Sequence, residues 1–146
     1  PIVRLRAADA LEKATRAHPA WLTPFKTTLL RHARSSGQHE VRWHLAQLLP
    51  RLPLTRRERA SAVTTLHRYL QDRSSIVRTC ALQALADLAA TDPALRPAAR
   101  ATIEAAMVDG TPAMRARGRK LLAHWPPDAG ASGAARSAGT RETPCV

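Results

Sequence analysis

The chemically most distinctive side chains of this sequence form two basic clusters. The first comprises Arg56, Arg57 and Arg59 and lies close to Arg51. The second comprises Arg115, Arg117, Arg119 and Lys120. Exposed clusters of this kind attract phosphate groups, with an affinity that falls steeply as salt rises. Neither is interleaved with aromatic residues that could stack bases, and the chain has no zinc-finger, RNP or glycine-rich phosphate signature. The clusters therefore indicate an anionic partner, of which nucleic acid is one alternative.

The histidines, cysteines and carboxylates show no spacing typical of a catalytic or metal site. No HExxH or CxxC motif occurs, and Cys80 lies far from Cys145 in the sequence. The chain also lacks the Gly-x-Ser-x-Gly elbow of many hydrolases. Its carboxylates are scattered and are better explained as helix caps or as ion pairs along helices. We therefore expect no catalytic residue, no bound metal and no cofactor.

The composition of the chain is that of one globular domain with a basic surface. Its 146 residues are 45% hydrophobic and carry 23 Lys+Arg against 11 Asp+Glu, a formal net charge of +12. This length allows a real core to be buried. No apolar run approaches the ~20 residues that span a bilayer. We expect a cytoplasmic protein without a membrane partner.

The elements that position these side chains repeat along the chain. An apolar residue followed by arginine recurs with the apolar residue at positions 3, 41, 77 and 114, spaced by 38, 36 and 37 residues. After each copy, apolar or small residues recur at offsets 4, 7, 8 and 11, which is one stripe of an α-helix. A period this steady indicates one supersecondary unit used repeatedly.

Further amphipathic helices are expected between these copies. One of them has an apolar stripe that includes Trp21 and Phe25, and another begins at a capping box of Thr55 and Glu58. The pattern predicts seven helices, at about 3–17, 20–34, 39–50, 55–71, 75–90, 94–108 and 112–124. Residues 126–146 are small and polar without periodicity, which predicts a disordered tail.

These helix pairs resemble the HEAT repeat. An aspartate six residues before the arginine strengthens the resemblance, as in Asp72 before Arg78 and Asp109 before Arg115, whereas Ser36 stands at that place before Arg42. The resemblance covers residues 1–125 and implies an all-α, right-handed α-solenoid of antiparallel helix pairs. Because the first copy looks like the second helix of a pair, we expect 1–125 to be a fragment of a longer array.

The resemblance also implies roles for the repeated residues. In HEAT repeats the aspartate and arginine usually form a structural ladder between neighbouring repeats. The residues in question here are Arg4, Arg42, Asp72, Arg78, Asp109 and Arg115. A phosphate-contact role for the arginines remains the alternative reading.

HEAT arrays usually bind partners through the concave face lined by the second helices. The residues that the stripe leaves on this face are Arg6, Lys13, Trp43, His44, Gln47, Arg51, Gln83, Asp87, Arg117 and Lys120. This mixed polar surface with a basic excess favours a monomeric, non-catalytic scaffold whose protein partner has an acidic surface. The alternative is an electrostatic nucleic-acid binder, similar to the DNA glycosylases built from HEAT-like repeats, with Asp87, Trp43 and Arg51 in its site.

Overall fold

The computed structural model describes residues 2–125, and over this range the regular secondary structure is all helical, without a strand. Seven α-helices confirm the number expected from the sequence. They are α1 (Ile2–Ala14), α2 (Lys26–Ser35), α3 (His39–Leu48), α4 (Arg56–Tyr69), α5 (Ser75–Thr91), α6 (Arg96–Asp109) and α7 (Pro112–Ala123). Three 3₁₀ segments accompany them: η1 (Pro19–Phe25), η2 (Leu49–Arg51) and η3 (Pro93–Leu95). The tail expected for 126–146 lies outside the described residues. None of the helices in the described range has the length and apolar character needed to cross a membrane.

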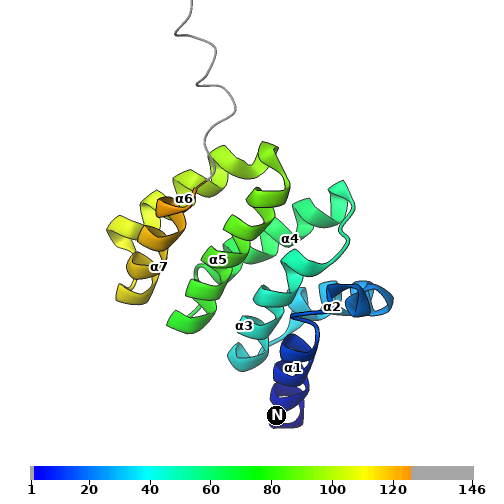
Figure 1. The fold of residues 1–146 in the computed structure, drawn as a ribbon. Helices are drawn as coiled ribbons and strands as arrows, with labels where there is room; N and C mark the ends of the chain where they lie inside the picture. The colour runs from blue at the N-terminus through cyan, green and yellow to red at the C-terminus, as the bar shows by residue number, and fades with distance from the viewer. Residues whose placement is uncertain (1, 126–146) are drawn as a thin grey trace, which may run out of the picture.

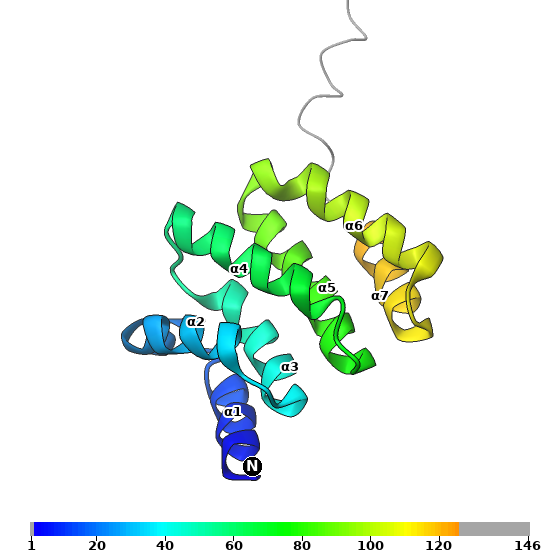
Figure 2. The same cartoon turned by 180° about the vertical axis from the view of Figure 1, so that it is seen from behind.

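The odd-numbered helices form one side of the molecule. Helix α1 packs on α3, α3 on α5, and α5 on α7, so that these four follow one another in space as they do in the chain (Figure 1). On the other side, α2, α4 and α6 each contact the odd-numbered helix that follows them, and α2 also contacts α4 (Figure 2). The chain therefore alternates between two layers, with α5 at the centre.

Helix α5 contributes more buried residues to the core than any other helix in the described range. Eight of its residues are buried, among them Val77, Leu82 and Leu88, because it is covered by α3, α4, α6 and α7. Ala81, Ala84 and Ala89 leave room for those neighbours to approach closely. A helix that is apolar nearly all round is expected at such a central position.

The start of α4 agrees with its sequence signal. At α4, Thr55 Oγ1 accepts from Glu58 N at 3.3 Å, while Thr55 N donates to Glu58 Oε2 at 2.8 Å, which confirms the capping box. Lys26 Nζ lies 2.9 Å from the same carboxylate. These contacts lower the pKa of Glu58 to about 2, with the Lys26 hydrogen bond as the largest cause.

The helix expected at 20–34 is wrong in its first part. Residues Pro19–Phe25 form a 3₁₀ segment, and α2 begins only at Lys26. Pro24 has no N–H to donate and its ring clashes with the carbonyl four residues earlier, so an α-helix cannot run through it. As a consequence Trp21 and Phe25 are 59% and 55% exposed rather than part of the core.

Candidate binding groove

A groove with polar side chains at its centre runs along the face formed by α3, α5 and α7. It consists of two adjoining hollows of about 380 Å³ and 280 Å³ that share Gln83 and Asp87 of α5. The first hollow lies between α3–η2 and α5, and the second between α5 and α7. The first is lined by Gln47, Pro50, Arg51, Cys80, Gln83, Ala84, Asp87 and Thr91. The second is lined by Gln83, Ala86, Asp87, Ala90, Lys120, Leu121, His124 and Trp125.

Hydrogen bonds fix the polar centre of this groove. Gln83 Nε2 donates to Asp87 Oδ1 at 2.8 Å, and Arg117 Nη1 of α7 donates to Gln83 Oε1 at 3.1 Å. Desolvation in the groove raises the pKa of Asp87, against the opposing effects of the Gln83 hydrogen bond and of the charges on Arg51 and Arg117. The centre of the groove therefore presents an amide and a carboxyl group whose orientations are set by α5 and α7.

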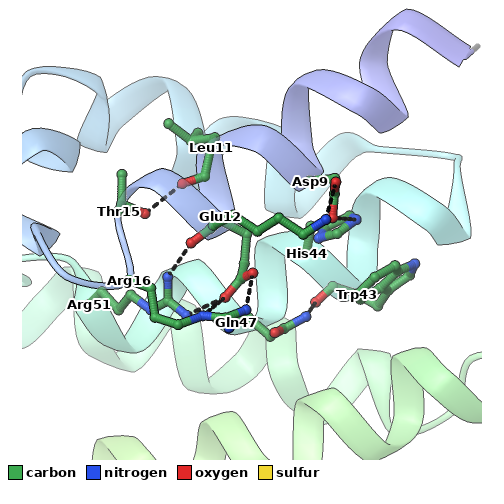
Figure 3. A network of polar contacts seen from close by, with 10 residues as sticks. Asp9, Leu11, Glu12, Thr15, Arg16, Trp43, His44, Gln47 and Arg51 are labelled. Atoms are coloured by element: carbon green, nitrogen blue, oxygen red, sulfur yellow. Dashed lines mark hydrogen bonds and ion pairs between the residues drawn. The ribbon is translucent and has the colours of Figure 1, made fainter.

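One wall of the groove is held by a buried carboxylate of α1. Glu12 is only 3% exposed, and its Oε1 accepts from Arg51 Nη2 at 2.5 Å while its carbonyl oxygen accepts from Arg51 Nη1 at 2.8 Å (Figure 3). Arg16 Nη2 donates to Glu12 Oε2 at 2.7 Å. Burial opposes ionisation of Glu12, but the hydrogen bonds from both arginines outweigh it and lower its pKa. The Arg51 side chain is therefore held in place, and its positive charge is compensated.

Five of the ten residues expected on the binding face line this groove. Gln47, Arg51, Gln83, Asp87 and Lys120 line it. Arg117 is joined to it through Gln83. Arg6 and Lys13 are exposed on α1 but line neither hollow, and Lys13 Nζ lies 2.8 Å from Asp9 Oδ2. Trp125, assigned to the core stripe from sequence, packs partly against the core and also lines the groove.

The expectation that His44 lies on an accessible face is wrong. Its side chain is 1% exposed, because α1 lies across α3 there and brings Asp9 Oδ1 to 3.9 Å from His44 Nε2. Burial lowers the pKa of His44, with Asp9 and Glu12 acting in the opposite direction. The neighbouring Trp43 is partly buried, packs against the core and stacks on the His44 ring (Figure 3). Neither ring is therefore presented to the groove.

In each of the two basic clusters, some arginines are exposed and one has a partner within the fold. In the first, Arg56 and Arg57 are exposed, whereas Arg59 Nη1 lies 2.7 Å from Asp92 Oδ2. In the second, Arg119 is exposed, whereas Arg115 Nη1 donates to the carbonyl oxygen of Gly110 at 2.9 Å. Arg59 and Arg115 thus have structural partners within the fold.

The repeated arginines and aspartates make one contact between copies. Arg42 Nε lies 2.9 Å from Asp72 Oδ2, although Ser36 replaces the aspartate before Arg42, so the contact reaches forward to the next turn. Arg42 Nη1 also donates to the carbonyl oxygen of Ser36 at 3.4 Å. In the part of the chain that the structure describes, neither Arg78 nor Asp109 forms an ion pair, and Arg4 is exposed.

Nothing within residues 2–125 brings together three histidine, cysteine, aspartate or glutamate side chains that could hold a metal ion. No family model, no curated protein and no solved structure matches this chain. The functional argument therefore starts from the groove and from the charges around it.

Proposed function

We propose that this chain is a non-catalytic scaffold that binds a protein partner through the groove of α3, α5 and α7. The observation that carries the proposal is the groove itself, in which side chains from three successive helices of one layer meet. We also propose that the helix pairs form a right-handed, HEAT-like α-solenoid. The Arg42–Asp72 pair supports this reading because it joins equivalent turns of neighbouring pairs.

The charges along the groove favour a partner with an acidic surface. Arg51 is compensated by Glu12, but Arg117 bonds to a neutral amide, and Lys120 forms no ion pair among the described residues. Asp87 is the single carboxylate among the residues that line the two hollows. The wall formed by α7 therefore keeps an excess of positive charge that a carboxylate of the partner would neutralise.

The groove is also suited to binding because its side chains stand on helices that are packed against one another. Gln83, Asp87 and Arg117 are already hydrogen-bonded in the free chain. A surface ordered in advance loses little conformational entropy when a partner docks. This is the mechanism that we assign to the scaffold: a fixed polar surface and no chemical step.

Site-specific photocrosslinking tests this function. We expect a photoreactive residue at Gln83 to capture a discrete protein, whereas the same residue at the exposed Thr64 of α4 should not. The double variant Arg117→Glu/Lys120→Glu should reduce capture at Gln83 by about tenfold or more, because removing charge complementarity at a desolvated contact is costly. Arg31→Glu, a single charge reversal on α2 away from the groove, is the control and should leave capture unchanged. Undiminished capture by the double variant would contradict a groove-based scaffold.

The exposed arginines Arg56, Arg57 and Arg119 support nucleic-acid binding as the second candidate function. Fluorescence anisotropy with duplex DNA over a range of salt concentrations separates the two functions. We expect binding too weak to measure at physiological salt if the chain is a protein scaffold. Tight binding with a steep salt dependence, whose log–log slope falls by about 1 for each of Arg56→Gln and Arg57→Gln, would instead establish the nucleic-acid function.

A further inference from the structure

A second polar cavity lies at a different place in the fold, where the α2–α3 turn meets the α4–α5 turn. Its volume is about 480 Å³, and it shares no residue with the groove. Four of its eight lining residues are arginines, and Asp72 is the single acidic one. The lining residues are Arg34, Ser36, Arg42, Arg68, Tyr69, Gln71, Asp72 and Arg73. We call this the arginine pocket.

The arginine pocket keeps an excess of three positive charges. Asp72 lies 2.9 Å from Arg42 Nε and compensates that residue alone. Arg68 Nη2 donates to the backbone carbonyl oxygen of Arg34 at 2.8 Å, which leaves its charge without a counter-charge. The exposed side chains of Arg34 and Arg73 form no ion pair within residues 2–125. Three arginines that line one cavity thus have no carboxylate partner among the described residues.

The wall of the pocket is fixed by contacts between helices that are distant in sequence. Tyr69, 2% exposed, donates its hydroxyl to the carbonyl oxygen of Ala33 at 2.6 Å and so ties α4 to the end of α2. Desolvation raises the pKa of Tyr69 to about 12, so the hydroxyl stays protonated and adds no negative charge to the pocket. Asp72 Oδ1 accepts from Ser74 N at 2.9 Å, which fixes the α4–α5 turn. The backbone that carries the arginines is therefore held by hydrogen bonds in the free chain, before a ligand binds.

We propose that the arginine pocket binds a compact phosphate anion of the pyrophosphate type. Guanidinium groups match phosphate oxygens in a bidentate geometry, and several of them around one cavity favour a ligand with more than one phosphate. A single phosphate group carries about −1.5 to −2 charges at neutral pH and would leave part of the positive excess uncompensated. A pyrophosphate group, free or at the end of a small organic molecule, matches the excess more closely and is small enough for the cavity. This binding activity is separate from the scaffold function, because it uses other residues on another part of the surface.

The sequence alone does not indicate this site, because the arginines of the pocket are dispersed along the chain. Arg34, Arg42, Arg68 and Arg73 span forty positions and belong to α2, α3, α4 and the α4–α5 turn. None of them falls in the two basic clusters. Only the packing of α2 against α4 brings Arg34 and Arg68 to one cavity.

Isothermal titration calorimetry of the full chain with sodium pyrophosphate tests the proposal. We expect saturable binding of about one pyrophosphate per chain at constant ionic strength, which keeps non-specific screening equal in all samples. Arg34→Gln and Arg73→Gln should each weaken the affinity by about tenfold, since each removes one charge-assisted contact. Neither side chain makes a contact that holds the fold together, so both variants should keep the far-ultraviolet circular dichroism of the wild type.

Arg119→Gln is the matched control, because it removes the same charge from an exposed position of α7, a helix that contributes no residue to the pocket. It should leave pyrophosphate affinity within about twofold of the wild type, as expected for an exposed charge at a distance. Binding that is absent, or equally weakened by Arg119→Gln and Arg34→Gln, would overturn the proposal. Binding of duplex DNA or of a phosphoserine peptide that pyrophosphate fails to displace would overturn it as well, by assigning these arginines to a macromolecular ligand. The photocrosslinking at Gln83 is independent of all these outcomes.

Discussion

The variant Glu12→Gln is expected to lower the free energy of unfolding by about 2 kcal/mol. Breaking a fully buried ion pair costs ~3–5 kcal/mol, and the figure is reduced here because Arg16 is 65% exposed and Arg51 21% exposed. The neutral amide leaves the Arg51 charge at the α1–α3 interface without a carboxylate. Urea unfolding followed by circular dichroism measures the loss.

The pH dependence of the same variant distinguishes lost charge from lost packing. The pKa of Glu12 is lower in the folded chain than in the unfolded one, so its stabilisation is complete above the unfolded value of about 4.3 and disappears as the pH falls through the folded value. The difference between wild type and Glu12→Gln should therefore shrink at acidic pH. Glu104→Gln is the matched control, since Glu104 pairs with Arg100 on an exposed helix face and should cost ~0.5 kcal/mol or less. A difference that stays constant down to strongly acidic pH would contradict the ionic explanation.

The variant Leu82→Ala is expected to destabilise the chain by about 3 kcal/mol, the largest effect that we foresee. Leu82 is 0% exposed on α5, the helix that contacts both layers, so the surrounding helices cannot collapse into the space that the side chain leaves. Leucine-to-alanine changes at such sites cost ~2–5 kcal/mol through lost transfer energy and a residual cavity. The midpoint of urea unfolding should fall while the slope of the transition is unchanged.

Ile76→Ala on the same helix provides the comparison. Ile76 is 58% exposed, so its truncation removes little buried surface and should change stability by ~0.5 kcal/mol or less. Equal effects of the two substitutions would show that α5 does not occupy the centre of the core. A large effect of Leu82→Ala alone would support the layered packing on which both the groove and the arginine pocket depend.

The two proposed sites make different use of the fold. The groove draws its side chains from one layer, through α3, α5 and α7. The arginine pocket lies at the turns where the chain passes between layers and draws on α2 and α4 as well. Because the sites share no residue, variants at Lys120 and at Arg73 should separate protein binding from anion binding in one purified chain.

Sequence periodicity predicted the helices well because helix formation depends on near neighbours. The apolar stripe after each apolar–arginine pair and the capping box at Thr55 are local signals, and the structure contains the corresponding helices. The signal failed at Pro24, where the apolar spacing suggested a helix and the missing N–H of proline prevented one. Local chemistry also predicted that Gln47, Gln83 and Lys120 would lie off the apolar stripe.

The sequence by itself determined the all-helical class, the number of helices and the faces that α3 and α5 bury. On α1 the expected apolar stripe is exposed at Val3, Ala7 and Ala14, and the buried residue is Glu12. Tertiary structure decided which polar side chains remain available, because that depends on how neighbouring helices approach. His44 is buried because α1 covers it, and the charge of Arg51 is paired because the same helix carries Glu12. The arginine pocket exists because α2 and α4 bring together charges that lie far apart in the chain. Such contacts between distant residues have no periodicity, so only the packed fold reveals them.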